Sequence, residues 1–325
     1  MDLPRAILPD PIHSDGIARL REHFLVEVFS DREQDMRLSA MMHADAVIVR
    51  NVPIGAELMD RCQRLKIISK HGAGVDNIDL GAASERGIVV TNVPGGNADA
   101  VAEGAVALML ATLRRVPEVH WQVASGNYSV RWHLRYAQLT KRTLGLVGIG
   151  KIGTRVAAIC SGGFGMRILA YDPALSQAGV AARGAAKVES LDVLLAEADV
   201  VSLHLPLTRE THHLIGREEL RRMKRSAILV NTARGPLIDE AALSEALAAG
   251  EISGAGLDVL EIEPPAADNP ILSAPNVVLS PHTAGSTEEA DRHLALAAAE
   301  NAIAVISGRR PMDLLNPQIW QQRRR

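Results

Sequence analysis

Leu144-Gly145-Leu146-Val147-Gly148-Ile149-Gly150-Lys151-Ile152-Gly153 is the stretch that decides the fold. Its first four residues predict a buried strand, and the run from Thr154 to Cys160 predicts a helix. Between them stands the spacing G-x-G-x-x-G. Glycines permit a tight turn and a close backbone approach, and the amino end of a helix offers unpaired N–H groups to a phosphate. Strand, glycine turn and helix in this order predict a dinucleotide-binding unit.

A carboxylate follows at the position that would select the cofactor. Asp172 ends the next predicted strand, 19 residues after Gly153. There it can accept hydrogen bonds from ribose hydroxyls, and it would repel a 2′-phosphate. The sequence therefore predicts NAD in preference to NADP. The alternative is that the glycines only form a turn and that Asp172 caps the turn Tyr171-Asp172-Pro173.

Short apolar runs alternate with helical patterns along the chain, which predicts βαβ units and parallel sheets. A helix predicted over about residues 98–115 separates two series of strands, with Val101, Ala105, Leu108 and Thr112 on one face. A closing helix is predicted over about residues 286–307. The predicted strands are residues 6–8, 25–28, 46–49, 65–68 and 88–90, and then 144–147, 168–171, 200–203, 227–230, 255–257 and 277–279.

Composition limits the class of protein. A chain of 325 residues favours two domains, and 47% hydrophobic and 22% charged residues are ordinary for a globular protein. A net charge of −3 gives no reason to expect nucleic acid or an anionic membrane as partner. Cys62 and Cys160 lack metal-ligand spacing, so we expect no metal, no disulfide framework and a cytoplasmic setting. Arg323-Arg324-Arg325 is predicted to be a solvated tail.

Three polar segments follow predicted strands of the second series, where open α/β sheets bind their ligands. They are residues 231–235, 258–264 and 280–285. Hydride addition to a carbonyl leaves negative charge on oxygen, so the site needs a proton donor and a cation. His282 is the predicted donor and Arg234 the predicted cation. Taken alone, His282 would be an ordinary loop residue and Arg234 a partner of Asp239.

Two carboxylates complete the predicted constellation. Glu263, hydrogen-bonded to the second imidazole nitrogen, would fix the tautomer of His282 and favour the protonated ring. Arg234 would also hold a substrate carboxylate in a forked geometry. Asp258 is placed to meet the nicotinamide amide. The alternative for Glu263 and Asp258 is that both are solvated loop carboxylates.

Together with Gly72-Ala73-Gly74-Val75-Asp76-Asn77-Ile78-Asp79 and residues 92–97, these motifs resemble the D-isomer-specific 2-hydroxyacid dehydrogenase family, which includes phosphoglycerate dehydrogenases and glyoxylate/hydroxypyruvate reductases. The resemblance implies an α/β protein with two doubly wound parallel-sheet domains. A Rossmann NAD domain, residues 99–287, would be inserted into a flavodoxin-like substrate domain, residues 1–98 and 288–325. It also implies a homodimer and interconversion of a small D-2-hydroxy acid with its 2-keto acid.

The resemblance also assigns binding residues. The backbone amides of Ala73 and Gly74, with Arg234 and His282, would hold the substrate, and successive small residues do form concavities of N–H groups suited to anions. The implied cofactor contacts are Gly148, Gly150, Lys151, Ile152, Gly153, Asp172, Pro206, Thr211, Thr232, Ala233, Arg234, Asp258, His282 and Gly285.

The sequence does not decide whether the substrate is phosphoglycerate-like or glyoxylate- or hydroxypyruvate-like. A second anionic group could be bound by nearby polar side chains, although such residues are more often surface charges. Trp132 resembles, by location only, a tryptophan that reaches a neighbouring subunit's site in glyoxylate/hydroxypyruvate reductases. An NAD-sensing corepressor or binding protein on the same scaffold is the alternative function. The polar candidates are Lys70, His71, Arg131, Trp132, His133 and Arg135.

Overall fold

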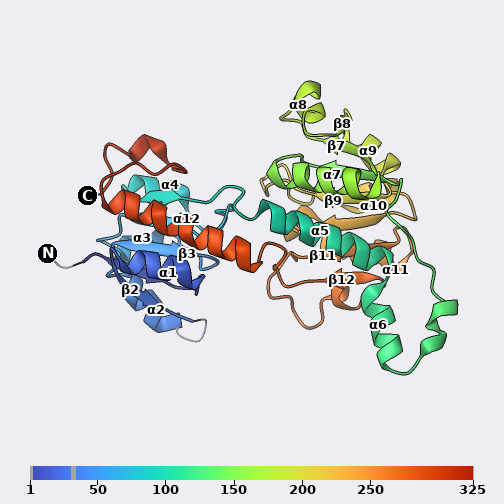
Figure 1. Ribbon diagram of the computed structural model, residues 1–325, viewed down its shortest axis with the longest axis horizontal. Helices are drawn as coiled ribbons and strands as arrows, with labels where there is room; N and C mark the ends of the chain where they lie inside the picture. The colour runs from blue at the N-terminus through green and yellow to red at the C-terminus, as the bar shows by residue number, and fades with distance from the viewer. Residues whose placement is uncertain (1–2, 31–33, 325) are drawn as a thin grey trace. The chain divides into compact units, whose positions relative to one another are not determined.

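The computed structural model describes residues 3–30 and 34–324. The chain divides into two compact units, whose elements are labelled in Figure 1. Unit 1 comprises Met1–Asn97 and Ser286–Arg325, and unit 2 comprises Ala98–Gly285. Unit 2 is thus a continuous stretch of chain inserted between the two parts of unit 1.

Unit 1 contains a five-stranded parallel sheet in the order β2-β1-β3-β4-β5. This is the flavodoxin-like strand order, and it confirms the fold class predicted for the first series of strands. Strands β3 and β4 are buried along their whole length, which explains their continuous apolar sequence. The strands are β1 (Arg5–Leu8), β2 (Leu25–Val28), β3 (Ala46–Val49), β4 (Ile67–Lys70) and β5 (Val89–Thr91).

Helices cover both faces of this sheet. The closing helix α12 packs against α1, where a Cβ added at Gly16 would lie 2.7 Å from Cβ of Ala295. The Ser69 hydroxyl on β4 donates to the carbonyl oxygen of Ala298 at 2.8 Å. Residues after unit 2 therefore complete the core of unit 1. The helices are α1 (Ser14–Arg21), α2 (Gln34–Met41), α3 (Ala56–Arg61), α4 (Leu80–Glu85) and α12 (Glu288–Ile306).

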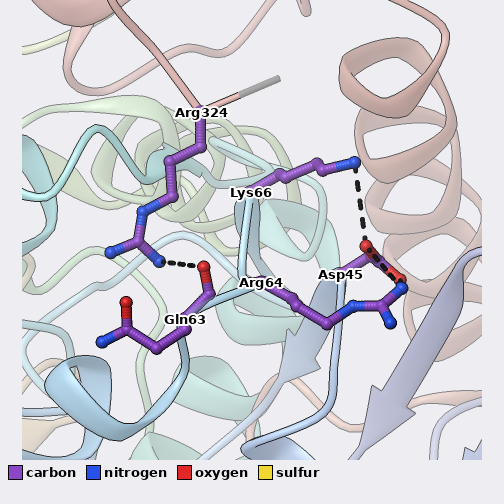
Figure 2. Close-up of a pocket in the computed structure, with 5 residues that line it drawn as sticks. All are labelled: Asp45, Gln63, Arg64, Lys66 and Arg324. Carbon is purple, nitrogen blue, oxygen red and sulfur yellow. Dashed lines mark hydrogen bonds and ion pairs between the residues drawn. The ribbon is translucent and has the colours of Figure 1, made fainter.

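The predicted solvated tail is wrong at the two arginines that the structure describes, whereas Arg325 lies outside the described residues. The Arg324 guanidinium donates to the carbonyl oxygens of Cys62 at 2.7 Å and Gln63 at 3.2 Å, and Arg323 stacks on the ring of Trp320. Figure 2 shows Arg324 beside a cavity of about 520 Å³ that Arg64, Lys66 and Asp45 also line. Backbone carbonyls before β4 hold this part of the chain in place.

Unit 2 contains a seven-stranded parallel sheet in the order β12-β11-β10-β9-β6-β7-β8. The order reverses beside β6, as in dinucleotide-binding folds, and confirms the predicted class. Six strands were predicted and the seventh, β8 (Ala186–Lys187), was missed because it has two residues and lies at the edge. The others are β6 (Thr143–Val147), β7 (Arg167–Tyr171), β9 (Val200–Leu203), β10 (Ile228–Asn231), β11 (Gly254–Leu257) and β12 (Val277–Leu279).

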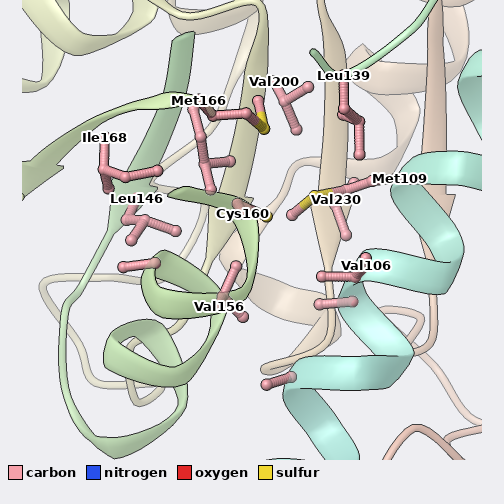
Figure 3. Packing of buried hydrophobic residues seen from close by; sticks show 14 of the residues in the cluster. Val106, Met109, Leu139, Leu146, Val156, Cys160, Met166, Ile168, Val200 and Val230 are labelled. Carbon is pink, nitrogen blue, oxygen red and sulfur yellow. The ribbon is translucent and has the colours of Figure 1, made fainter. Parts of the chain in front are cut away.

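Two hydrophobic clusters hold the helices on this sheet. Figure 3 shows one, in which Met109 of α5 and Cys160 of α7 pack against strand residues such as Val230. The other joins the opposite face to α9, α10 and α11. The predicted inner face of α5, from Val101 to Thr112, is buried. The helices are α5 (Ala98–Leu113), α6 (Val116–Ala124), α7 (Lys151–Phe164), α8 (Gln177–Ala181), α9 (Leu191–Glu197), α10 (Arg217–Arg222) and α11 (Glu240–Ala248).

Several predicted boundaries are wrong by one or two residues. Leu65 and Ile88 are fully buried but precede β4 and β5, so their apolar character reflects burial rather than strand pairing. Helix α5 ends at Leu113 rather than near residue 115. Arg115 adopts a left-handed φ of 51° and is the N-cap of α6. In the described ranges, no helix combines the length and apolarity that a membrane crossing requires.

Candidate active site

Three adjacent strands of unit 2 end at one edge of its sheet. In the parallel register, Asn231 on β10 lies opposite Leu257 on β11, which lies opposite Leu279 on β12. The three polar segments predicted from the sequence begin directly after these positions. The sheet therefore brings the segments that carry Arg234, Glu263 and His282 to the same edge.

His282 and Glu263 form a hydrogen-bonded pair. Nδ1 of His282 lies 2.8 Å from Oε2 of Glu263, whose other oxygen accepts from the N–H of Leu260 at 3.0 Å. The imidazole is 49% exposed, and its Nε2 makes no hydrogen bond with any residue that the structure describes. A carboxylate on Nδ1 keeps the proton on that nitrogen and leaves Nε2 for exchange with a ligand.

The backbone of His282 is held in an uncommon conformation. Its φ is 57°, and its N–H donates to the carbonyl oxygen of Asp258 at 2.7 Å. A left-handed residue other than glycine persists only where its surroundings fix it, and such residues cluster at functional sites. The loop thus aims the ring at Glu263 by backbone constraint.

Asp258 anchors this loop. Its carboxylate is 2% exposed, and Oδ1 accepts from the Ser280 hydroxyl at 2.6 Å and from the Thr283 N–H at 2.8 Å. Oδ2 accepts from the Ala284 N–H at 2.9 Å. Hydrogen bonds to an ionised acceptor are stronger than neutral ones. The sequence predicted only a cofactor contact for Asp258 and not this positioning role. The donors follow β12, 22 to 26 residues further along the chain, and only the register of β11 and β12 brings them alongside.

Arg234 lies on a turn that Asn231 organises. The fully buried Asn231 amide donates to the carbonyl oxygen of Arg234 at 2.8 Å, and its oxygen accepts from the Ala233 N–H at 2.9 Å. Arg234 is half-buried, and its Nη1 donates to the Ala233 carbonyl at 2.6 Å. The next residue, Gly235, packs on the backbone of Leu260. The Arg234 segment therefore lies directly against the segment that leads to Glu263.

Two glycines of the motif are required by the packing of the chain itself. Gly148 has φ 86°, and a Cβ there would lie 2.6 Å from the carbonyl oxygen of His204. A Cβ at Gly153 would lie 2.6 Å from the carbonyl oxygen of Gly148. A side chain at Gly148 would push the glycine turn away from the segment after β9, and a side chain at Gly153 would push α7 away from the turn.

Gly150 is different. Apart from its own helix and its chain neighbours, no atom of the described residues lies within 4 Å of a Cβ built there. It caps the amino end of α7, and no side-chain hydrogen bond closes that end. The backbone is thus open where a pyrophosphate would meet the unpaired N–H groups of a helix.

A cavity of about 580 Å³ opens beside this helix end. Its lining includes three cations, Lys151, Arg155 and Arg183, and one anion, Asp99, which pairs with Arg155. The excess of positive charge next to open N–H groups suits the phosphates of a dinucleotide. The residues present therefore fit the predicted cofactor.

Asp172 lies where the motif predicted it. The half-buried carboxylate accepts from the Ile149 N–H at 3.1 Å and from the Ala174 N–H at 3.1 Å. It therefore closes its own turn and also contacts the glycine turn. The predicted turn-capping role and a position suited to an adenosine ribose are both compatible with this geometry.

The other predicted cofactor residues lie on neighbouring loops of unit 2. Thr211 donates to the Pro206 carbonyl at 2.9 Å, which fixes the loop after β9. The Thr232 hydroxyl is buried and has no hydrogen-bond partner among the described residues. Ile152 lies in the first turn of α7, Ala233 precedes Arg234, and Gly285 ends unit 2.

The predicted substrate loop is in unit 1, after β4. Asn92 donates to the Ala73 carbonyl at 2.7 Å, and the Val93 N–H donates to the Gly72 carbonyl at 2.9 Å. The N–H groups of Ala73 and Gly74 donate to no group in the described part of the chain. With its carbonyls bound and its amides available, this loop suits an anion.

Two candidates for a second anion site have structural roles. The Lys70 ammonium contacts the carbonyl oxygen of Arg50 and donates to Oδ1 of Asn77 at 2.8 Å. Burial, with the charge of Arg50, lowers the pKa of His71 to about 4. Lys70 is therefore used in holding the loop, and Nε2 of His71 lies 3.4 Å from the carbonyl oxygen of Asp291 on α12. The segment with Arg131 and Trp132 is exposed, and Arg131 stacks on the Trp132 ring at 4.3 Å.

His204, which the sequence reasoning missed, lies behind the glycine turn. Burial lowers its pKa to about 4, and its Nε2 lies 2.9 Å from the Ser202 hydroxyl. The unfolded chain, with a pKa near 6.5, binds this proton more readily. The free energy of unfolding therefore decreases as the pH falls from about 6.5 towards 4, and the decrease is about 2 kcal/mol at pH 5.

Replacing His204 with asparagine, which can still bond Ser202, is expected to remove this part of the acid sensitivity. The measurement is the urea unfolding free energy of both proteins at pH 7 and pH 5. The loss between the two pH values should be smaller in the variant by about 2 kcal/mol. Equal losses in the two proteins would show that His204 is not held neutral.

Residues 106–284 match the family model described as D-isomer specific 2-hydroxyacid dehydrogenase, NAD binding domain. A glyoxylate reductase from Korarchaeum cryptofilum is 42% identical, over 98% of either chain. A D-3-phosphoglycerate dehydrogenase from Archaeoglobus fulgidus is 40% identical over 94% of this chain and 58% of its own length.

A comparison with solved structures also finds a protein that is similar over nearly the whole chain. The NADPH-dependent glyoxylate/hydroxypyruvate reductase from Sinorhizobium meliloti, in complex with citrate, has a TM-score of 0.85 and 29% identity. The match covers 97% of this chain and 99% of that chain. The chain therefore belongs to the D-isomer specific 2-hydroxyacid dehydrogenase family and is an NAD-dependent enzyme of that family, with residues 106–284 matching its NAD-binding domain.

Proposed function

We propose that the protein interconverts a small D-2-hydroxy acid and its 2-keto acid, with His282 as the acid–base group. The observation that carries this proposal is the 2.8 Å contact between Nδ1 of His282 and Glu263, with Nε2 left for a substrate. Glu263 orients the ring and fixes its tautomer, with a proton on Nδ1. Arg234 binds the substrate and polarises its carbonyl.

In the reductive direction, NADH held by the glycine turn and the amino end of α7 would supply the hydride for the carbonyl carbon. Nε2 of His282 gives its proton to the carbonyl oxygen, and the imidazole becomes neutral while Nδ1–H remains bonded to Glu263. The Arg234 guanidinium stabilises the negative charge that develops on the oxygen. In the oxidative direction, the neutral Nε2 accepts the hydroxyl proton as the hydride leaves carbon.

The substrate carboxylate is assigned to the amides of Ala73 and Gly74, together with Arg234. The available N–H groups of that loop support the assignment. Gly148, Gly150, Lys151, Ile152 and Gly153 would hold the pyrophosphate. The remaining proposed cofactor contacts are Asp172, Pro206, Thr211, Thr232, Ala233, Arg234, Asp258, His282 and Gly285.

The test of the proposed function is a panel of 2-keto acids offered with NADH to the purified protein. Phosphohydroxypyruvate and sulfopyruvate carry a second anionic group, whereas glyoxylate, hydroxypyruvate and pyruvate do not. NADH consumption, followed by its absorbance, identifies the preferred acid. An NAD-sensing binding protein would bind NADH and turn over none of them, which would reject the proposal.

Asp172 is expected to set the preference for NAD over NADP. Replacing it with alanine removes the charge that repels a 2′-phosphate and the acceptor for the ribose hydroxyls. The ratio of kcat/KM for NADH to that for NADPH should fall by about tenfold or more, since one charged hydrogen bond is worth about 1.5–3 kcal/mol. An unchanged ratio would mean that Asp172 only closes its turn.

A second copy of the chain is proposed to cover an exposed aromatic arm of unit 2. Trp121 on α6 is 67% exposed and Trp132 is 74% exposed, and α6 projects from the sheet of its unit (Figure 1). Light scattering after gel filtration should give about twice the 34.8 kDa of one chain. Replacing both tryptophans with serine should shift the mass towards one chain, whereas an unshifted mass would place the interface elsewhere.

A further inference from the structure

Two histidines and a carboxylate gather on unit 2 away from the His282–Glu263 pair. His212 and His213 lie between β9 and α10, and Glu261 lies on the segment after β11. One ligand atom from each residue lies within 4.8 Å of the other two. Nε2 of His213 is 2.8 Å from Oε1 of Glu261, and the two imidazole ring centres are 4.0 Å apart.

These donors suit a borderline divalent cation. Two imidazole nitrogens and one carboxylate oxygen form a common ligand set for Zn²⁺, with water completing the shell. Around a tetrahedral zinc ion, at bond lengths of about 2.0–2.2 Å, ligand atoms lie roughly 3.4 Å apart. Small side-chain movements would therefore let the three ligand atoms bind one cation in place of the existing hydrogen bond.

The backbone holds the three residues in place. His213 has a left-handed φ of 51°, and its N–H donates to the Pro236 carbonyl at 2.8 Å. The Glu261 N–H donates to Oε2 of Glu240 at 3.1 Å. The Glu240 carboxylate adds negative charge beside the site. His212 is exposed, while His213 and Glu261 are half-buried, so an ion can reach the site from solvent.

The cluster is separate from the proposed catalytic pair. Glu263 bonds to His282 and to the Leu260 N–H, whereas Glu261 is directed at His213. The sequence analysis predicted no metal from the spacing of the two cysteines. The histidine cluster gives no such signal, because His212 and His213 are adjacent and Glu261 is 48 residues away from His213. Only the folding of the chain, which places the segment after β9 beside the segment after β11, brings the ligands together.

We propose that His212, His213 and Glu261 bind one Zn²⁺ ion per chain. The ion would join the loop before α10 to the segment after β11. Because it would bind the folded chain and not the unfolded one, occupancy should raise the thermal unfolding temperature.

The test uses the full chain without a histidine tag, stripped of metal with a chelator, and isothermal titration with ZnCl₂ at neutral pH. Single variants His212→Asn, His213→Asn and Glu261→Gln are compared with His43→Asn, which changes an exposed histidine of unit 1. We expect one ion per chain in the wild type and in the control. Each of the three variants should weaken binding by about tenfold or more.

Thermal unfolding provides the second measurement. Saturating Zn²⁺ should raise the unfolding temperature of the wild type and of His43→Asn, and the rise should be lost in the three variants. His212→Asn keeps the test valid if a change at the half-buried His213 disturbs folding. Absence of saturable binding in the wild type, or equal binding in His212→Asn and the wild type, would overturn the proposal.

Discussion

Replacing His282 with alanine is expected to lower kcat by about 10²- to 10⁴-fold, the usual contribution of a positioned acid–base group. In the proposed mechanism Nε2 of His282 carries the proton of the reaction, and the glycine turn and α7 are the proposed main cofactor contacts. The dissociation constant for NADH should therefore change by less than about threefold. The measurements are steady-state kinetics with the best keto acid of the panel and a fluorescence titration with NADH.

The matched control is His43→Ala, which alters an exposed histidine of unit 1 and should leave both quantities unchanged. Glu263→Gln keeps a hydrogen-bond acceptor for Nδ1 but removes the charge, so its loss of kcat should be intermediate. Equal losses of NADH affinity and kcat in His282→Ala would assign His282 to cofactor binding and would contradict its role in proton transfer.

Gly235→Ala is expected to destabilise unit 2 by about 3 kcal/mol or more and to abolish turnover. A Cβ at Gly235 would lie 1.8 Å from the carbonyl oxygen of Leu260 and 2.5 Å from the nitrogen of Glu261. These are backbone atoms, so no rotamer change can relieve the clash and the two segments must separate. Overpacking at buried sites costs about 1–3 kcal/mol when neighbours can adjust, and more when they cannot.

Gly162→Ala on α7 is the matched control. No atom of the described residues beyond its own helix and chain neighbours lies within 4 Å of a Cβ there. The same substitution in an open helical position should stabilise by about 0.5–1 kcal/mol. Urea unfolding of both variants provides the comparison. A Gly235→Ala protein with the unfolding midpoint of the wild type would mean that the two segments are not in contact as described.

The order of strands and helices could be predicted because most strands of the two sheets are buried apolar runs between helical patterns. The predictions failed where strand pairing does not coincide with a buried apolar sequence. β8 has only Ala186 and Lys187, neither of them buried, and so carries no apolar signal. Leu65 and Ile88 are buried without being paired, so they extended the predicted strands by one or two residues.

The candidate site could be predicted as far as it depends on strand ends. Arg234, Glu263 and His282 each follow a strand, and parallel strands bring such positions to one edge. Side-chain pairings across that edge depend on register and loop conformation, which the sequence does not specify. The bonds of Asp258 to Ser280, Thr283 and Ala284, and the contact of His213 with Glu261, could therefore be found only in the folded chain.

The central claim is that this chain transfers a hydride to C2 of a 2-keto acid and that His282 supplies the proton. The most direct measurement is a reaction with NADH deuterated at the transferable position, followed by mass spectrometry and chiral chromatography of the product. The substrate is the best keto acid of the panel other than glyoxylate, because glycolate has no D or L form. We predict a 2-hydroxy acid of D configuration with one deuterium at C2, formed by His282→Ala about 10²- to 10⁴-fold more slowly than by the wild type. A product of L configuration, a product without deuterium, or equal rates of formation by the two proteins would contradict the account.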